Sequence, residues 1–582
     1  MRCHAAFVGA AIGAIWAPSV PVAVVGVSLV AGLVGRRHAA ILGVVLLLVV
    51  AGASTRATAG LDLPAAGPFA GWVTLVDDPR STGPIGVRVT VIADGRRLVA
   101  TAHGPVSGRL DDHLAGERVR VEGTVRPVSR SDRRSLDRHI VGRLTVERMT
   151  DRGGAAPIGS VANAIRRRLS DGASSLSESD HALFLGMVIG DDRGQTPVTA
   201  DDFRAGGLGH LLVVSGQNVA FVLAVAMPVA GRLRPAGRAL LLFALLGGFA
   251  VLTRFEPSVL RAVAMAGVGI GSAALGSPLD GRRGLSLALA GLLVIDPFLI
   301  RVVAFQLSAA ATAGIVWASG PLAERLRGPR WFAVPVATTV SAQLGVSPVL
   351  VAIFGPLPLA SLPANVLAGP ASGAVMMWGC TAGLVAGVVG GTTAEVLHLP
   401  TRCLLWWIGG VASFAARAPA ASLGAMALAV LAVACLAAIR WPRTSTAAVV
   451  VAALIAAGSI ADAPRLRDGW TAVSDGATVL RRSGTVIVVL DDPGRPRWLL
   501  ESLRLTGVRR VDLVVARDGD RADADAALAL ADRFGAVPIA APPLHRVPGG
   551  RTVRPGQLVR VGAILLAVDV VDPRLGVAEV LE

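Results

Sequence analysis

The stretch GGLGHLLVVSGQNVAFVLAV, residues 206–225, is long and apolar enough to cross a membrane, yet it carries Ser215, Gly216, Gln217 and Asn218 in a row at its middle. About twenty apolar residues span a hydrocarbon core of about 30 Å. Polar groups in hydrocarbon need a partner, so these four residues must face protein or water. The stretch therefore predicts a membrane helix that breaks near its middle and lines a cavity.

The composition extends the membrane assignment to most of the chain. Of the 582 residues, 53% are hydrophobic and 16% are charged, and the mean hydropathy is +0.62. A soluble globular protein is about a quarter charged. These values exclude an ordinary soluble protein and indicate a polytopic α-helical membrane protein.

All 56 basic residues are arginines, and the formal charge is +16. This balance favours an anionic partner or the anionic inner leaflet of the lipid bilayer. The four cysteines have no paired spacing, so we predict no disulfide framework, no metal site and no cofactor.

Changes of residue pattern predict five parts. Residues 1–57 hold two or three transmembrane segments, and residues 61–150 form a small β-barrel that we interpret as OB-like. Residues 157–172 form an interfacial amphipathic helix. Residues 178–462 form a multi-span region with about eight to ten spans, and residues 463–582 form a soluble α/β domain.

The predicted barrel contains five segments of alternating hydrophobicity separated by Gly, Pro and Asp turns, as in GVRVTVIADG and GERVRVEGTVRP. Its Arg residues suit single-stranded nucleic acid, and Arg130, Arg133 and Arg134 in RSDRRSLDRH are the candidate contacts. Aromatic stacking partners are scarce, with Phe69 and Trp72 as the candidates. A scaffold role for this domain is therefore an equal alternative.

Three further blocks place polar residues inside apolar sequence. FEPSVLRAVAM contains Arg261, AFQLSAAATAG contains Gln306 and Ser308, and SAQLGVSPVLVAIFGPLPLASLPANVLAGP contains Gln343 and Asn365. Gly and Pro at the same places are typical of discontinuous helices around a cavity. Arg261 and helix N-termini favour an anion such as phosphate.

Each of these residues also has a simpler interpretation. Ser308, Gln343 and Asn365 taken singly can hydrogen bond between helices, and Arg261 can extend its guanidinium to the membrane surface. His210 is most simply an interfacial residue. The functional hypothesis depends on the clustering of these residues.

The four blocks together resemble the ComEC competence family. GGLGHLLVVSGQNVAFVLAV resembles the family signature GLxHLLAISGLHV, and the other three blocks resemble later family blocks in the same order. MVIGDDRG, with its acidic-Arg-Gly loop at residues 191–194, also fits. The resemblance covers residues 186–373 well, and the order of the flanking domains agrees with it.

Two departures from the family pattern matter. Asn218 stands where the family commonly has His, which leaves hydrogen bonding but removes proton transfer. Many members carry a C-terminal metallo-β-lactamase-like domain with a THPDADH metal motif, whereas this tail is short and reads VDLVVARDGDRADAD, with Arg517 in place of a His ligand. We expect its aspartates to form a solvated loop and helix start, in a degenerate domain that is not an enzyme.

The resemblance implies a channel that conducts single-stranded DNA across the cytoplasmic membrane during natural transformation. It also implies a DNA receptor, a cytosolic motor or single-strand-binding proteins as partners, and an extracytoplasmic OB-like domain. The expected lining comprises His210, Ser215, Gly216, Gln217, Asn218, Arg261, Gln306, Ser308, Gln343 and Asn365. The alternatives are a secondary transporter of a small anionic solute and a membrane-bound nuclease.

Overall fold

The computed structural model describes residues 49–50, 61–82, 86–326, 328–418, 421–440, 445–542, 547–553, 556–562, 564–571 and 574–580. The predicted N-terminal transmembrane segments therefore lie outside the described residues, apart from Val49 and Val50. The chain forms two compact units. The first comprises Met1–Gly194, Val213–Ile353 and Gly369–Leu405, and the second comprises Gln195–Leu212, Phe354–Ala368 and Trp406–Glu582.

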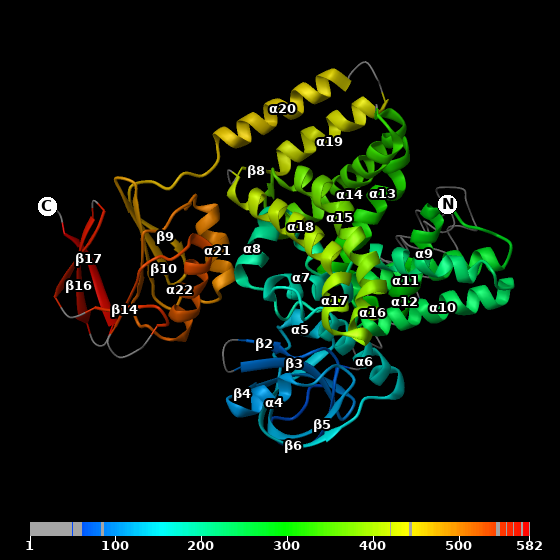
Figure 1. Ribbon diagram of the computed structural model, residues 1–582, viewed down its shortest axis with the longest axis horizontal. Helices are drawn as coiled ribbons and strands as arrows, with labels where there is room; N and C mark the ends of the chain where they lie inside the picture. Colours follow the sequence, from blue (N-terminus) through cyan, green and yellow to red (C-terminus); the bar gives the residue numbers. More distant parts are fainter. Residues whose placement is uncertain are drawn as a thin grey trace. The chain divides into compact units, whose positions relative to one another are not determined.

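The first unit contains the predicted β domain, whose strands close into a ring (Figure 1). β1 pairs antiparallel with both β3 and β5, β5 pairs with β6, and β4 pairs antiparallel with β3 and parallel with β6. The alternating pattern places Val73, Val89, Val119 and Leu144 in the core. The elements are β1 (Gly67–Leu75), β2 (Arg80–Ser81), β3 (Gly86–Ala93), β4 (Arg96–His103), α4 (Pro105–Asp111), β5 (Arg118–Pro127), α5 (Arg133–Leu136) and β6 (Ile140–Gly153).

Helices follow the β domain. α6 (Pro157–Gly172) covers the residues of the predicted amphipathic helix, and its position at a membrane surface stays a prediction. The remaining helices of this unit are α7 (Glu178–Ile189), α9 (Gly216–Ala230), α10 (Pro235–Leu252), α11 (Pro257–Ala274), α12 (Gly281–Ile295), α13 (Val303–Arg325), α14 (Arg330–Phe354), α16 (Leu384–Val389) and α17 (Gly391–Leu397). α14 continues by one residue into the second unit, and α15 (Ser361–Trp378) and α18 (Leu399–Arg417) each have residues in both units.

Five helices of the described chain are long and apolar enough to cross a membrane: α10, α11, α13, α14 and the continuous segment Ser361–Val389. Two shorter apolar helices are α9 and Val450–Ala461 within α20 (Ser445–Ala461). The five long helices confirm a multi-span membrane protein. They are fewer than the eight to ten predicted spans, because several apolar stretches form helices that are too short.

Glycines let two of the long helices approach closely. A Cβ added to Gly314 in α13 would lie 2.1 Å from the Ser341 carbonyl oxygen in α14, and one added to Gly345 would lie 2.4 Å from the Ala310 carbonyl oxygen. Small residues at such crossings allow backbone-to-backbone packing where the hydrophobic effect does not drive association.

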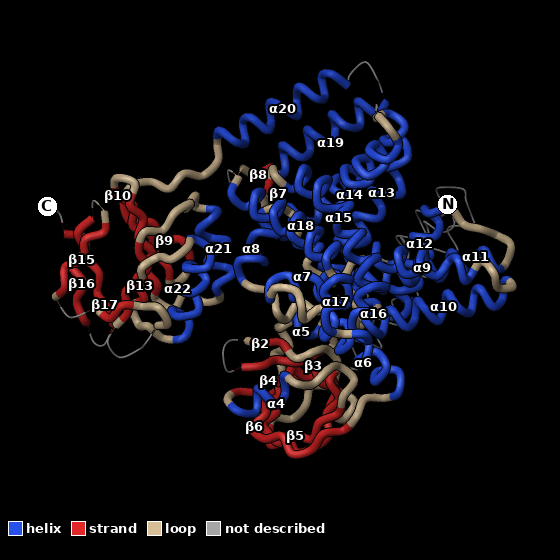
Figure 2. The backbone as a smooth tube through the Cα atoms, viewed as in Figure 1, coloured by secondary structure: helices blue, strands red, loops and turns tan. Residues whose placement is uncertain are grey.

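The second unit contains the predicted C-terminal α/β domain (Figure 2). Its six-stranded sheet has the order β14-β13-β12-β11-β10-β9, antiparallel from β9 to β11 and parallel from β11 to β14. Three further strands, β15, β16 and β17, form a separate antiparallel sheet. The elements are β9 (Gly469–Ser474), β10 (Ala477–Arg482), β11 (Thr485–Leu490), α21 (Pro496–Leu505), β12 (Leu513–Ala516), α22 (Arg521–Phe534), β13 (Ile539–Ala541), β14 (Arg551–Thr552), β15 (Gln557–Val561), β16 (Ile564–Val571) and β17 (Arg574–Val580).

The second unit also takes in segments that the sequence assigned to the multi-span region. These are α8 (Pro197–Ala205), the short turn η2 (Gly209–Leu211), and helices α19 (Ala425–Arg440) and α20. β7 (Leu357–Pro358) pairs with β8 (Ser422–Leu423) in the same unit. The compact units therefore cross the predicted domain boundary at residue 462.

Candidate functional site

The polar run that interrupts residues 206–225 lies at the start of a helix. Ser215 is extended and precedes the first residue of α9, Gly216. Upstream, the chain makes the short turn η2. The stretch is therefore two segments joined at Ser215, which is where the sequence places a helix break.

Asn218 and Ser215 fix this helix start to the neighbouring protein. Asn218 is buried, and its Nδ2 donates to the Met187 carbonyl oxygen at 2.9 Å. The Ser215 Oγ donates to the Asn218 Oδ1 at 3.1 Å. Both polar ends of the Asn218 side chain therefore bind protein, and the residue acts here as a hydrogen-bonding brace.

Gly216 allows the start of α9 to contact α11. A Cβ added at this position would lie 2.5 Å from the Arg261 Nη2, 3.1 Å from the Ala262 Cβ and 3.2 Å from the Ser258 carbonyl oxygen. The Ser258 Oγ donates to the Val214 carbonyl oxygen at 3.0 Å. Any side chain at residue 216 would occupy the place of the Arg261 guanidinium.

Arg261 joins this contact to a third helix. Its Nε donates to the Ser308 Oγ of α13 at 2.7 Å, and its Nη1 contacts the Met265 Sδ at 3.4 Å. Among the residues that the structure describes, no carboxylate pairs with this half-buried guanidinium. We call Gly216, Ser258, Arg261 and Ser308 the Arg261 cluster, and it unites three of the four polar blocks.

The other predicted lining residues of the first unit make contacts elsewhere. The Gln306 Nε2 donates to the Ile300 carbonyl oxygen at 2.7 Å. Gln343 is half-buried in α14. Gln217 is exposed, and its Nε2 lies 3.6 Å from the place of a Cβ on Gly373 in α15. The structure thus brings Gly216, Arg261 and Ser308 together but not the two glutamines of α13 and α14.

His210 and Asn365 belong to the second unit. The Asn365 Nδ2 donates to the Ser361 carbonyl oxygen at 2.7 Å and to the Gly207 carbonyl oxygen at 3.3 Å. His210 is exposed in η2. The first part of the 206–225 stretch is therefore braced by the fourth polar block.

In the β domain, Arg130, Arg133 and Arg134 are all exposed around the short helix α5. Asp132 caps this helix by accepting from the Ser135 backbone N–H at 3.2 Å. The three guanidinium groups are thus presented on a local turn, and their contact with DNA stays a prediction.

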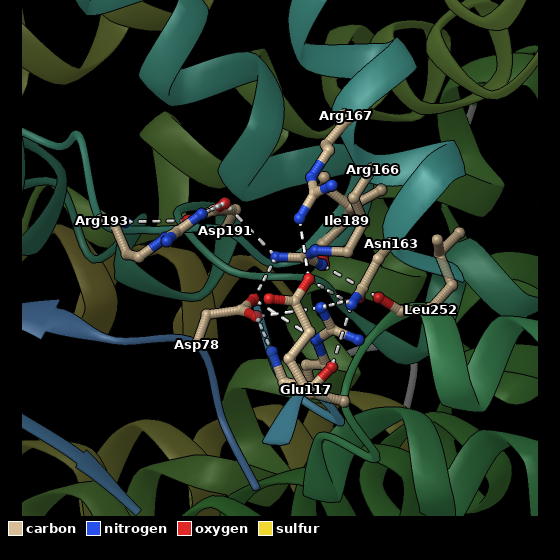
Figure 3. Close-up of polar contacts among 11 residues, drawn as sticks. Asp78, Glu117, Asn163, Arg166, Arg167, Ile189, Asp191, Arg193 and Leu252 are labelled. Atoms are coloured by element: carbon tan, nitrogen blue, oxygen red, sulfur yellow. Dashed lines mark hydrogen bonds and ion pairs between the residues drawn. The ribbon is translucent and has the colours of Figure 1, made fainter. Parts of the chain in front are cut away.

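A buried ion-pair network in the first unit was not anticipated from the sequence (Figure 3). Its centre is Arg166 of α6, which is 3% exposed. Its Nη2 lies 2.7 Å from Asp78 Oδ2 and 3.3 Å from Asp191 Oδ2. Its Nη1 donates to the carbonyl oxygens of Ile189 at 2.8 Å and Leu252 at 2.9 Å. One side chain thereby ties the β domain to the ends of α7 and α10.

Arg254 and Arg193 complete the network. The Arg254 Nη2 donates to Asp78 Oδ1 at 2.9 Å and to Asn163 Oδ1 at 2.7 Å. Arg193 binds Asp191 through its Nε at 2.8 Å and its Nη2 at 2.7 Å. Burial alone would raise the pKa of the Asp191 carboxyl, but the hydrogen bonds and charge of Arg193, with the charge of Arg166, lower it to about 2. This carboxylate therefore stays charged at any physiological pH.

The sequence contained a partial signal for this network. Asp191 and Arg193 form the acidic-Arg-Gly loop that resembles the competence family. Asp78 and Arg254 lie in loops without a recognisable spacing, and Arg254 has a positive φ of 58°. A non-glycine residue in this conformation is uncommon and needs support from its surroundings, which Asp78 and Asn163 supply.

In the C-terminal domain, one expectation about the aspartates is wrong. Asp520 is exposed and caps α22, as expected, and accepts from the Asp523 N–H at 2.9 Å. Asp523, however, is fully buried, and it accepts from the backbone N–H groups of Asp492, Asp518 and Gly519. These three bonds make Asp523 a structural brace of the loop after β12 and not a solvated residue.

In the described parts of both units, no three His, Cys, Asp or Glu side chains are grouped as metal ligands would be. The loss of nuclease activity in the C-terminal domain stays a prediction from the sequence.

Comparison with known proteins shows which residues of the chain resemble a known family. Residues 187–444 match the family described as "Competence protein". A protein of Escherichia coli (strain K12) described as "Uncharacterized protein YcaI" is 30% identical over 213 residues, which is 33% of this chain. The chain matches 27% of that relative's length, and no solved structure matches it. The region that contains the Arg261 cluster, residues 187–444, is thus the part of the chain that matches the Competence protein family.

Proposed function

We propose that this protein takes part in DNA uptake during natural transformation and that its membrane helices conduct single-stranded DNA across the cytoplasmic membrane. The family match of residues 187–444 supports a role in competence. The five long apolar helices support a membrane location. The specific substrate, a single strand, is argued from the residues below.

Arg261 is the observation that carries this proposal. A charged side chain within a membrane-spanning helix is costly and is a functional residue by default, with a partner of opposite charge. Arg261 instead contacts Ser308 and the small residue Gly216. A phosphate group would supply the missing negative charge, and a guanidinium suits phosphate oxygens through paired N–H donors.

The scarcity of acidic residues in the long apolar helices supports a polyanionic substrate. In the five long apolar helices, Glu324 is the only acidic residue, and it lies in the last turn of α13. A path for nucleic acid needs polar walls with some positive charge and no ring of carboxylates, because like charges would repel the phosphates. The helices meet this requirement.

The two extramembrane domains have separate proposed roles. The closed ring of β1, β3, β4, β5 and β6 supports an OB-like assignment, with Arg130, Arg133 and Arg134 contacting the strand outside the cell. The C-terminal domain is a degenerate, non-catalytic domain. Energy for transport comes from partners, namely a cytosolic motor or single-strand-binding proteins, after delivery by a DNA receptor.

Charge reversal at Arg261 tests the proposal. We expect Arg261→Glu to insert normally and to lose about tenfold or more of the uptake of a fluorescent single-stranded oligonucleotide into proteoliposomes, since a hydrogen bond to a charged group contributes about 1.5–3 kcal/mol. Arg261→Lys should retain part of the uptake, because it keeps the charge without the planar fork.

Arg325→Glu is the matched control, because Arg325 is exposed at the end of α13 and donates only to the Pro321 carbonyl oxygen among the described residues. It should transport as the unmodified protein does. Normal oligonucleotide uptake by Arg261→Glu would contradict the proposal. Uptake of small phosphorylated solutes without oligonucleotides would favour a secondary transporter instead.

A further inference from the structure

A cavity of about 510 Å³ opens among the helices of the first unit, away from the Arg261 cluster. Its walls come from residues 158–169 of α6, 188–189 of α7, 221–226 of α9 and 244–252 of α10. Met377 of α15, Cys380 of the following π-helical stretch Gly379–Gly383 and Leu384 of α16 complete them. Every side chain in the lining is apolar, and the Cys380 thiol is the most polar of them. The volume is typical of a small-molecule site, which usually has about 300–1,000 Å³.

The walls are held apart by contacts outside the cavity. Arg166 donates to the carbonyl oxygens of Ile189 and Leu252, which are the last residues of α7 and α10 and both line the cavity. At the far end of α6, a Cβ on Gly172 would lie 2.5 Å from the Gly387 backbone nitrogen. α6 is therefore fixed at two points, and the cavity cannot close by a simple shift of this helix.

The cavity has the depth of one leaflet. Along α10 it extends from Leu252 to Ala244, which at 1.5 Å per residue is about 12 Å. Half of a hydrocarbon core measures about 15 Å. Because Leu252 is the last residue of α10 and binds Arg166, the cavity begins at the polar end of this membrane helix and runs inward.

The mouth of the cavity continues onto an apolar surface. Ile158 and Val161 of α6 line the cavity and are 70% and 61% exposed. An amphipathic helix with such an apolar side lies in the membrane interface with that side toward the acyl chains. The medium that meets this mouth is then lipid and not water.

We propose that this cavity binds an acyl chain of a membrane phospholipid. Val50, one of the two described residues of the N-terminal segment, packs in a different cluster, with Leu285, Leu289 and Phe305 of α12 and α13. The site is independent of the proposed DNA path and would exist in a transporter or a channel.

Two glycines of α10 provide a matched test. A Cβ added to Gly248 or to Gly247 would meet no atom within 4 Å. Gly248 lines the cavity, whereas Gly247 does not. Gly248→Leu therefore fills the cavity, and Gly247→Leu makes the same change of size and helix propensity beside it.

The probe is a phosphatidylcholine with a photoactivatable diazirine in one acyl chain, in vesicles of phosphatidylethanolamine and phosphatidylglycerol that contain the full chain. We expect residues 158–169 and 244–252 to be labelled several-fold more than the segment around exposed Leu240 of the same helix. Gly248→Leu should lower this labelling at least fivefold, and Gly247→Leu should leave it unchanged.

Equal labelling of the unmodified protein and Gly248→Leu, or labelling no higher than around Leu240, would overturn the proposal. A measurement on the unmodified protein guards against a misfolded variant. In detergent, added phospholipid should slow alkylation of Cys380 several-fold and leave exposed Cys403 unaffected, and equal effects on the two thiols would again contradict the site.

Discussion

Gly216 sets the distance between the start of α9 and the guanidinium of Arg261. The nearest atom to an added Cβ is the Arg261 Nη2, at the far end of a flexible side chain. The Ala262 Cβ at 3.1 Å and the Ser258 carbonyl oxygen at 3.2 Å would each have to shift by a few tenths of an ångström. A methyl group at this position would therefore displace Arg261 and require only small shifts in the packing of α9 against α11. Gly216 therefore mainly determines where the Arg261 guanidinium lies.

We expect Gly216→Ala to change the free energy of unfolding by no more than about 1 kcal/mol and to lower oligonucleotide uptake several-fold. The reason is that Arg261 must turn away from Ser308 to accommodate the new Cβ. Gly247→Ala, which adds a methyl group in open space, is the control. Uptake by Gly216→Ala equal to that of the control would show that the position of Arg261 does not matter.

Asn218 supplies both a hydrogen-bond donor and an acceptor at the position where the competence signature commonly has His. The competence signature has His at this place, and the Asn side chain still donates to the Met187 carbonyl oxygen and accepts from Ser215. A neutral His has one donor and one acceptor, and an amide supplies both. The Asn218 amide can therefore fill both hydrogen-bonding roles of a neutral ring.

At the scale of elements, α6 links the β domain to the membrane helices through one of its three consecutive arginines. Arg166 is 3% exposed and binds Asp78, Asp191 and two helix carbonyls, whereas Arg167 is 56% exposed and pairs with Glu117. Removing one partner of a buried ion pair leaves an uncompensated charge. The two neighbours should therefore differ strongly in their effect.

We predict that Arg166→Met lowers the free energy of unfolding of the purified full chain by about 3 kcal/mol or more, because Asp78 and Asp191 lose their shared partner. Arg167→Met should lower it by less than about 1 kcal/mol, as is usual for exposed ion pairs. Thermal unfolding in one detergent, followed by tryptophan fluorescence, compares the two variants. Similar midpoints for both would mean that the network does not stabilise the unit.

At the scale of the whole molecule, the C-terminal domain is tied to α8 within the second unit. The Arg504 Nε lies 3.3 Å from Asp201 Oδ1, and Arg533 pairs with both Asp201 and Asp202. Burial raises the pKa of the Asp201 carboxyl, and the charges of Arg504 and Arg533 oppose this rise. A domain without a recognisable metal motif thus contributes positive charge to a buried acidic pair.

Arg504→Met should lower the free energy of unfolding of the full chain by about 3 kcal/mol, because Asp201 would remain buried with less compensation. Asp201→Asn in the same background should recover part of the loss by removing the buried charge. Exposed Arg510, which pairs with Asp512 two residues away, supplies the control Arg510→Met. If Asp201→Asn brings no recovery, the contact is not electrostatic.

The sequence predicted much of the fold, because alternating and continuous apolar patterns are local signals. The five strands of the β domain and α6 lie where the patterns indicated, and the residues after 463 form the predicted mixture of helices and strands. The described residues contain five helices that are long and apolar enough to span a membrane, fewer than the eight to ten predicted spans, since hydropathy does not show where Gly and Pro end a helix.

The candidate site was predictable in part for the same reason. Gly216, Arg261 and Ser308 each stand out as polar or small in apolar sequence, and the structure brings them together. The Arg166 network did not stand out, because RRR at residues 166–168 gives no sign of which arginine turns inward. Its partners are distant, with Asp78 88 residues before it and Leu252 86 residues after it.

The ring of the β domain has a consequence for association with other chains. β1 pairs with β5 along most of its length and with β3 over Val73–Leu75, so among the described strands the open edges include two-residue β2 and residues Gly67–Trp72 of β1. Long open edges invite strand addition and aggregation, and closure removes them. The three-stranded sheet of the tail lacks this protection, because β15 and β17 are each paired on one side. Intermolecular β-pairing should therefore start more readily at the tail than at the largely closed β domain.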